Sequence, residues 1–222
     1  MAKTRTSRLA RVKFRILLLI LSFPWLAFLL AKIGRYTSNF LSAPDPQPGS
    51  LEQWRRLEEL HEMAHYAVIA GYLKRLIPGG NVLDVGCGQG ILARDIEPFV
   101  GRYLGIDRDE PSIGAARQIG LGNAEFEIAD AQHFSPSGMF DAIVFNESLY
   151  YLKDPLAILR RYSRTLMPDG VLIVSTVASR RALPLIQALR TACELIDETI
   201  VLNHLGVVWV ILALRCKPDA SC

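Results

Sequence analysis

The first 44 residues contain no acidic side chain, although eight of the 25 Lys and Arg residues lie there. The formal net charge of +3 therefore divides into +8 for residues 1–44 and −5 for residues 45–222, which hold all 22 acidic side chains. Nucleic-acid binding needs a basic face that contacts the phosphates. The acidic body of the chain thus argues against nucleic acid as its main partner.

Cysteine is scarce and shows no paired pattern. The chain contains no C-x-x-C motif, no internal repeat and no low-complexity tract, and its four cysteines are scattered at Cys87, Cys193, Cys216 and Cys222. A chain of 222 residues that is 50% apolar and 21% charged can bury a core without disulfides. We therefore expect reduced thiols, as in a cytosolic protein, and no metal site.

An uncharged stretch interrupts the basic N-terminal segment. Residues 16–31 lie between Arg15 and Lys32, carry no charge and contain Pro24. This run is shorter than the ~20 residues of a typical spanning helix. We predict that residues 1–41 form a basic segment with a hydrophobic helix that associates with a membrane. A cleaved signal peptide, for which no clean A-x-A site is present, and a start codon placed too far upstream are the alternatives.

Beyond this segment the pattern is that of one globular domain, expected over 51–216 and followed by a tail at 217–222. Residues 42–50 contain three prolines and are expected to form a linker. An S-x-x-Q capping box at 50–53 opens a helix expected to reach residue 76. The other expected helices cover 91–96, 111–119, 155–166 and 183–195, and the expected strands cover 81–85, 103–106, 125–128, 142–145, 171–175, 198–202 and 207–214.

The alternation of strands and helices predicts an α/β fold: a Rossmann-like, doubly wound and mostly parallel sheet of seven strands. The last two strands are joined by a turn of only a few residues, which is too short for a parallel crossover. They should therefore form an antiparallel hairpin that closes the sheet with one reversed strand. In doubly wound sheets, ligands bind at the carboxyl ends of the strands, where the strand order reverses.

Three successive strand ends carry residues suited to a nucleoside. The first leads into a turn with Gly86, Gly88 and Gly90, where the backbone can approach a ligand closely. The second ends at Asp107, seventeen residues after Gly90, where a carboxylate can accept hydrogen bonds from both hydroxyls of a ribose. The third leads to Asp130, which can accept from an adenine amino group. Together they predict a cofactor that contains adenosine.

The third glycine of the dinucleotide motif G-x-G-x-x-G is missing. Gly86 and Gly88 fit its first two positions, but position 91 is Ile91. Asp84, two residues before Gly86, would also oppose a pyrophosphate, whereas it suits a ligand with a cationic end, such as an amino-acid ammonium. An NAD-dependent oxidoreductase is therefore the disfavoured alternative.

The ordered motifs resemble those of class I S-adenosylmethionine-dependent methyltransferases. The stretches that carry the resemblance are VLDVGCGQG (82–90), GIDRD (105–109), ADA (129–131), FDAIVFNESLYYL (140–152) and LMPDGVLIVS (166–175). They span roughly residues 51–216, and their combination is specific for the superfamily but not for a substrate. The N-E-S-L-Y-Y stretch is similar to that of small-molecule methyltransferases, including nodulation-factor N-methyltransferases. The basic N-terminal segment lies outside the family pattern.

The resemblance implies S-adenosylmethionine as cofactor and a role for each matching residue. The three glycines would shape the turn under the methionine part, and Asp84 would orient it. Asp107 would hold the ribose, with Arg108 beside the adenine. Asp130 and the amide of Ala131 would contact the adenine, and Asn146 would lie near the sulfonium. The alternatives are that Asp84 caps the turn and that Arg108 is a solvated surface residue.

Methyl transfer needs a base only when the acceptor arrives protonated. The candidates for contact with the acceptor are Glu147, Tyr150, Tyr151, His65 and His133. We favour Glu147, Tyr150 and His65; packing is the alternative for the tyrosines, and a place on the helix surface is the commoner explanation for His65. The acceptor is expected to be a small or lipid-linked molecule methylated on oxygen or nitrogen. A non-catalytic, membrane-tethered S-adenosylmethionine-binding module is the second alternative.

The charge pattern and the implied cofactor disagree about the orientation of the chain. The positive-inside rule would keep the N-terminus in the cytoplasm and export the domain of a spanning chain, whereas S-adenosylmethionine is made in the cytosol. We therefore expect residues 1–36 to attach to the cytoplasmic face of a membrane, with the catalytic domain in the cytoplasm.

Overall fold

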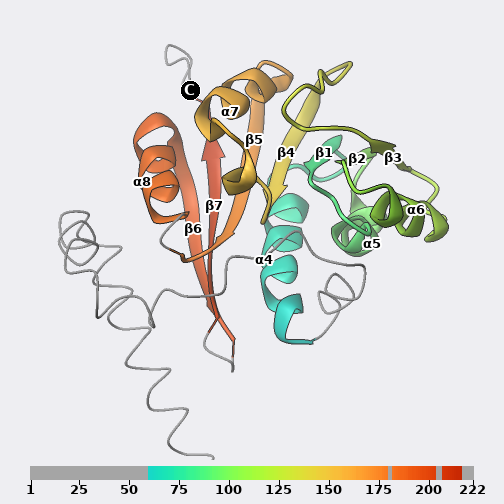
Figure 1. Cartoon of the computed structure of the whole chain (residues 1–222), viewed down its shortest axis with the longest axis horizontal. Coiled ribbons are helices and arrows are strands. Elements are labelled where there is room, and N and C mark those ends of the chain that lie inside the picture. The colour runs from blue at the N-terminus through green and yellow to red at the C-terminus, as the bar shows by residue number, and fades with distance from the viewer. Residues whose placement is uncertain (1–59, 180–181, 204–206, 217–222) are drawn as a thin grey trace, which may run out of the picture.

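The sheet of this computed structural model contains seven strands in the order β3-β2-β1-β4-β5-β7-β6 (Figure 1). The structure describes residues 60–179, 182–203 and 207–216. Strands β1 to β5 lie parallel to one another, whereas β7 is antiparallel to both β5 and β6. The strands are β1 (Val82–Val85), β2 (Tyr103–Asp107), β3 (Ala124–Ile128), β4 (Phe140–Asn146), β5 (Leu166–Val177), β6 (Glu194–Leu202) and β7 (Val208–Arg215).

Helices cover both faces of the sheet. Strand residues alternate between the two faces, so Ala142 and Val144 of β4 pack under one helix layer while Ile143 and Phe145 pack under the other. The helices are α4 (Leu60–Leu76), α5 (Ile91–Ile96), α6 (Glu110–Gln118), α7 (Pro155–Ser163) and α8 (Ala182–Ala192), with short 3-10 turns η2 (Glu97–Phe99) and η3 (Leu149–Tyr151). The first three helices share one core cluster, and α7 and α8 share the other. The predicted Rossmann-like α/β fold is confirmed.

The predicted antiparallel hairpin with one reversed strand is confirmed, and the structure adds its place in the sheet. The reversed strand, β7, lies between β5 and β6, and β6 forms the edge (Figure 1). The expected helix over 183–195 ends at Ala192, because β6 already begins at Glu194. All six residues from Trp209 to Leu214 are buried, which explains why the sheet places this strand inside and the more polar β6 at its edge.

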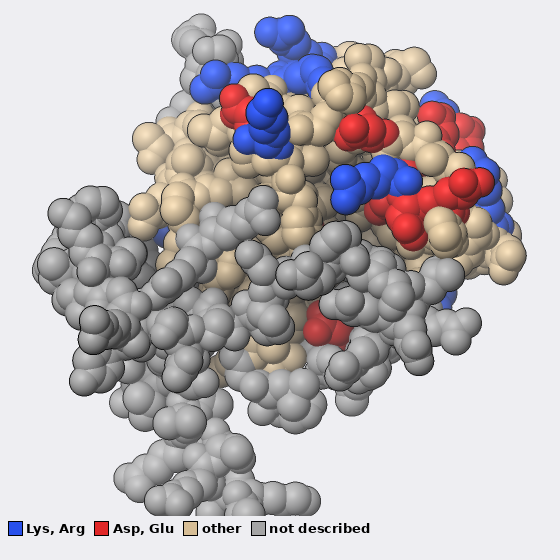
Figure 2. All heavy atoms as spheres, viewed as in Figure 1, with Lys and Arg blue, Asp and Glu red and all other residues tan. Residues whose placement is uncertain are grey.

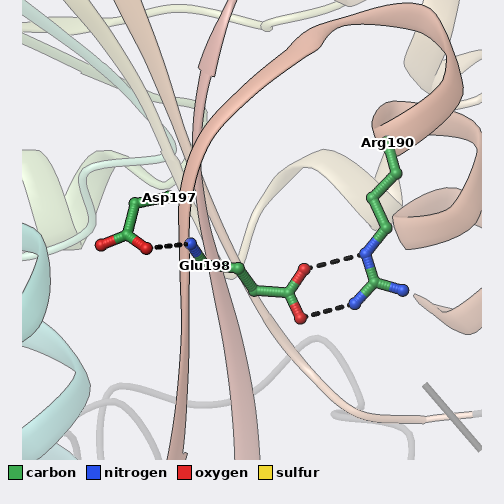
Figure 3. A network of polar contacts seen from close by, with 3 residues as sticks. All are labelled: Arg190, Asp197 and Glu198. Atoms are coloured by element: carbon green, nitrogen blue, oxygen red, sulfur yellow. Dashed lines mark hydrogen bonds and ion pairs between the residues drawn. The ribbon is translucent and has the colours of Figure 1, made fainter. Parts of the chain in front are cut away.

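A bidentate ion pair holds the edge strand to its covering helix (Figure 3). Arg190 of α8 donates from Nε and Nη2 to the two carboxylate oxygens of Glu198 in β6, at 2.8 and 2.5 Å. The backbone N–H of Glu198 donates to the carboxylate of Asp197 at 2.9 Å. Both side chains of the pair are about one-fifth exposed, so solvent screens the pair less than it screens a surface pair.

Two further boundaries differ from the expected ones. Strand β5 begins at Leu166, so the helix expected over 155–166 ends at Ser163. Phe140 pairs with Leu166 but Ala142 pairs with Val171, so the extra residues of β5 bulge out of the ladder. A bulge of this kind leaves no alternation for a sequence pattern to reveal.

The predictions for the two ends of the chain lie outside the described residues. They are the membrane-associating segment with its helix (1–41), the linker (42–50), the capping box (50–53), the start of the next helix and the tail (217–222). Within the described ranges, no helix combines the length and the apolar character that a membrane crossing requires. On the face shown in Figure 2, described basic and acidic side chains lie next to one another, so their charges are mixed there.

Candidate functional site

The order of the strands reverses between β1 and β4, and the glycine turn follows β1 at this point. The backbone N–H groups of Gly86 and Cys87 donate to the carbonyl of Ile106 in β2, at 2.8 and 3.0 Å. Gly86 has a φ of 85°, and a Cβ there would lie 2.5 Å from the Cβ of Ser148. The hydroxyl of Ser148 in turn donates to the carbonyl of Val85. This close approach explains why position 86 requires glycine.

Gly88 faces open space instead. It has a φ of 53°, and a Cβ built there would meet no atom within 4 Å. Its N–H donates to Oδ2 of Asp107 at 3.0 Å, while Oδ1 of Asp107 accepts from the N–H of Asp109 at 2.9 Å. Two backbone donors thus orient the Asp107 carboxylate beside the turn, and each oxygen keeps a further lone pair for a ligand hydroxyl.

Asp84 is the most deeply buried acid of the site, with 1% of its surface exposed. Its Oδ2 accepts from the hydroxyl of Tyr103 at 2.6 Å, and its Oδ1 has no hydrogen-bond partner within the described part of the chain. Burial raises the pKa of Asp84 to about 7; Tyr103 opposes this shift and the charge of Asp107 adds to it. A buried acceptor without a partner is rare and suits a cationic donor from a ligand.

Asn146 ends β4 and has an unpaired oxygen of its own. Its Oδ1 is buried without a hydrogen-bond partner among the residues the structure describes. Burial and the charges of Asp84 and Glu147 raise the pKa of Tyr66 of α4, and the side chain of Asn146 lowers it. Tyr66 therefore lies within electrostatic reach of the residues predicted to contact the methionine part. Its helical spacing with the buried Ile69 and Leu73 places it on the core-facing side of α4.

The turn after β3 lies beside Asp107. The N–H of Ala129 donates to the carbonyl of Asp107 at 2.8 Å, which brings the predicted ribose and adenine contacts together. Asp130 is exposed, and its Oδ1 accepts from the N–H of Gln132 at 2.8 Å. Arg108 is also exposed. Its exposure agrees both with a place beside an open ligand site and with the alternative of a solvated surface residue.

Glu147 links the ends of β4 and β5. Its carboxylate accepts from the N–H of Val177 at 3.1 Å, from the Tyr150 hydroxyl at 3.0 Å and from the Ser175 hydroxyl at 3.3 Å. Burial raises the pKa of Glu147 to about 7, although these three hydrogen bonds lower it. It is the one non-glycine residue in the described ranges with a positive φ, 52°. A positive φ strains the backbone of a residue that has a side chain. Strained residues of this kind cluster at functional sites, where the surrounding structure maintains the conformation.

Two tyrosines follow Glu147. Tyr150 is buried, and Tyr151 is 39% exposed. Their ring centroids lie 4.4 Å apart, and the hydroxyl of Tyr150 lies 3.4 Å from that of Tyr151. Tyr150 therefore packs against Tyr151 and also donates a hydrogen bond to the carboxylate of Glu147. Among the other candidates, His133 is exposed and donates its backbone N–H to the carbonyl of Asp130.

The structure places His65 in the core, not on the surface of α4. The ring is 1% exposed, and its centroid lies 4.9 Å from that of Trp209 in a stacked arrangement and 4.4 Å from that of Tyr66. Burial lowers the pKa of His65 to about 3, and the backbone of Glu62 partly offsets this effect. A ring this weakly basic is a poor base at neutral pH. The geometry favours packing, and the role of His65 in catalysis stays a prediction.

Replacing His65 with phenylalanine should make the protein less sensitive to acid. The pKa of about 3 in the folded state lies below the ordinary histidine value of 6.5, so protonation stabilises the unfolded state as the pH falls below 6.5. Between pH 7.5 and pH 5 this linkage costs the wild type ~2 kcal/mol, which the variant should not lose. Urea unfolding at both pH values measures the difference. His133→Phe, at an exposed position, is the control. If the wild type and His65→Phe lose the same free energy of unfolding between the two pH values, the low pKa of His65 is refuted.

Residues 51–202 match a family model described as "Methyltransferase domain". The chain is 32% identical over 106 residues to "Ubiquinone biosynthesis O-methyltransferase" of Xanthomonas campestris pv. campestris (strain B100), with 46% of this chain and 44% of the relative covered. It is 37% identical over 102 residues to "Nocamycin O-methyltransferase" of Saccharothrix syringae, with 42% and 36% covered. The chain thus spans less than half the length of these curated relatives.

Solved structures share the fold. The N-methyltransferase NodS from Bradyrhizobium japonicum WM9, in complex with S-adenosyl-L-homocysteine, superimposes with a TM-score of 0.65 at 21% identity and covers 77% of this chain and 94% of its own. The [4+2]-cyclase SpnF superimposes with a TM-score of 0.60 at 20% identity, with 70% of this chain and 83% of SpnF covered. Since one of these proteins is a methyltransferase and the other a cyclase by name, the shared fold does not by itself identify a reaction.

Proposed function

Because the chain belongs to the methyltransferase domain family over residues 51–202, we propose that it transfers a methyl group from S-adenosylmethionine to an oxygen or nitrogen atom of a small-molecule acceptor. Family membership confirms the predicted superfamily, enzyme class and cofactor. It also favours this function over NAD-dependent oxidoreduction. The individual roles of the site residues and the acceptor are parts of the proposal.

The observation that carries the proposal is the unpaired, buried Oδ1 of Asp84 beside a glycine turn that leaves space for a ligand. The residues present fit the cofactor: Asp84, Gly86, Gly88, Gly90 and Asn146 would hold its methionine part. Asp107 would hold the ribose, and the turn after β3, with Arg108 nearby, would hold the adenine. When bound, S-adenosylmethionine supplies a methyl group already activated on a sulfonium.

Since the methyl group arrives activated, the chain's own residues contribute mainly by holding the acceptor in line with it. Glu147 can remove a proton from an acceptor hydroxyl or ammonium group, because its pKa of about 7 leaves it partly ionised at neutral pH. The hydrogen bonds from Tyr150, Ser175 and the Val177 amide orient its carboxylate. Tyr151, partly exposed, would line the acceptor side.

The relatives support a small acceptor without identifying it. Two of them are named O-methyltransferases, of ubiquinone biosynthesis and of nocamycin, and NodS is named an N-methyltransferase. A lipid-linked acceptor would agree with the membrane association inferred for residues 1–41. That association, and a catalytic domain in the cytoplasm, remain proposals from the sequence.

Incubation of the full chain with S-adenosylmethionine labelled in its methyl group tests the function. The acceptors are fractions of a cell extract and a panel of phenols, catechols and amines. We expect label in one class of small molecule, and calorimetry should show cofactor binding without an acceptor. Cofactor binding without transfer to any fraction would favour the non-catalytic binding module. Binding of NAD in place of S-adenosylmethionine would favour the oxidoreductase.

A further inference from the structure

Two neighbouring residues of α7 hold the turn that follows β3. Arg161 donates from Nη1 to the carbonyl oxygen of Gln132 and from Nη2 to that of Ala131, each at 2.5 Å. The hydroxyl of Tyr162 donates to the same Ala131 carbonyl at 3.1 Å. The partners are 29 to 31 positions apart in the sequence, so these bonds fasten the turn to a distant element.

The charge of Arg161 is directed at backbone carbonyls. Within the described ranges, no carboxylate lies at ion-pair distance from its guanidinium, whose central carbon lies 5.2 Å from the centroid of the Tyr162 ring. The Nε of Arg161 is buried without a hydrogen-bond partner among the same residues. The two terminal nitrogens therefore determine how this side chain is oriented. Hydrogen bonds from a charged donor are roughly twice as strong as neutral ones.

The same peptide unit connects this contact to Asp130. The carbonyl of Ala131 is held by α7, and the N–H of Gln132, on the other side of that peptide bond, donates to Oδ1 of Asp130 at 2.8 Å. Because a peptide unit is planar and rigid, moving its carbonyl also moves its N–H and the carboxylate bound to it. Burial and the charge of Asp130 raise the pKa of Tyr162 to about 12, and Arg161 opposes this shift, so the three groups interact.

We propose that Arg161 and Tyr162 are positioning residues that hold the Asp130–Ala131 turn in the geometry that recognises the amino group of adenine. The inference rests on the proposed function, since it assumes that this turn contacts the cofactor base. Its consequence is that selectivity for adenine depends on α7, on the far side of the sheet from α4. A change in this helix then alters which base is accepted without touching the ligand.

Calorimetry with two ligands tests the inference. S-adenosylhomocysteine carries the adenine amino group, and S-inosylhomocysteine carries an oxygen there, which the Asp130 carboxylate would repel. The wild-type chain should prefer the first ligand by roughly tenfold to a hundredfold, as expected when a charged hydrogen bond is lost. Arg161→Met should lower this preference about fivefold or more. Arg160→Met, at an exposed position of the same helix, is the matched control and should leave it unchanged.

A purely structural role predicts a different result. If folded Arg161→Met keeps the wild-type preference, or loses affinity equally for both ligands, the inference is overturned. If this variant does not fold, Tyr162→Phe removes one of the hydrogen bonds, keeps the ring, and should lower the preference about twofold to threefold; an unchanged preference overturns the inference here too. A wild type that binds both ligands equally overturns it but leaves the proposed function standing. A wild type that binds neither contradicts the proposed function itself.

Discussion

Replacing Asp107 with alanine should weaken binding of S-adenosylmethionine by roughly tenfold to a hundredfold, because hydrogen bonds to a charged group contribute ~1.5–3 kcal/mol. The N–H groups of Gly88 and Asp109 hold the carboxylate, so the carboxylate is already oriented before a ribose binds. Calorimetry with the full chain measures the loss. Unchanged affinity would contradict the central assignment of the site.

The controls separate binding from folding. Asp107→Ala also removes the acceptor of two backbone N–H groups, so its thermal unfolding should be compared with that of the wild type. Asp107→Asn keeps the shape and one acceptor oxygen, and its loss of affinity should be smaller. Asp169→Asn changes an exposed acid in the first part of β5, and binding should stay at the wild-type value. Equal loss in Asp107→Ala and Asp169→Asn would point to a non-specific effect of charge.

Replacing Glu147 with glutamine should lower turnover by roughly a hundredfold to ten-thousandfold, which is the usual contribution of a positioned base. Affinity for the cofactor should stay within about twofold of the wild type, because we place the acceptor and not the cofactor at Glu147. The wild-type rate should rise as the pH increases through about 7, since burial raises the pKa of Glu147 to about 7 and only its ionised form takes a proton. The variant should lack this rise.

Tyr150→Phe is the matched control for Glu147. It keeps the carboxylate but removes the hydroxyl that donates to it at 3.0 Å. Because that hydrogen bond lowers the pKa of Glu147, the pH at which the rate rises should shift upward, with a smaller loss of turnover than in Glu147→Gln. If Glu147→Gln reduces cofactor affinity as much as turnover, Glu147 belongs to the cofactor site or to the core.

The ends of the helices and strands show where the local sequence pattern predicts the structure correctly. The helices capped by Asp109 and Asp154 begin within one residue of their expected starts, because capping depends on neighbours in the sequence. In contrast, the first part of β5 and the first residues of β6 were not predicted as strand. Their conformation depends on pairing with Phe140 and with Arg215, which no local signal reports.

The same contrast holds for the site. The glycine turn and the acids Asp107 and Asp130, at three successive strand ends, are visible in the sequence because strand periodicity places them at one edge of the sheet. The sequence does not reveal that Tyr103 occupies one oxygen of Asp84, that three donors surround Glu147, or that His65 stacks on Trp209. Apart from the bond between Tyr150 and Glu147, which are three positions apart, these contacts join residues that are distant in the sequence.

By itself, the sequence of this chain determined the alternating α/β class, because this class follows from spacings within and between adjacent elements. The ordered motifs of the sequence also carried the resemblance to the methyltransferase family and the prediction of a site for adenosine. Only the tertiary structure decided that β7 enters the sheet between β5 and β6, and that α7 reaches the turn after β3 through Arg161 and Tyr162. Strand order and helix-to-loop contacts arise from packing between segments far apart in the chain, and the free energy of such packing has no local signature.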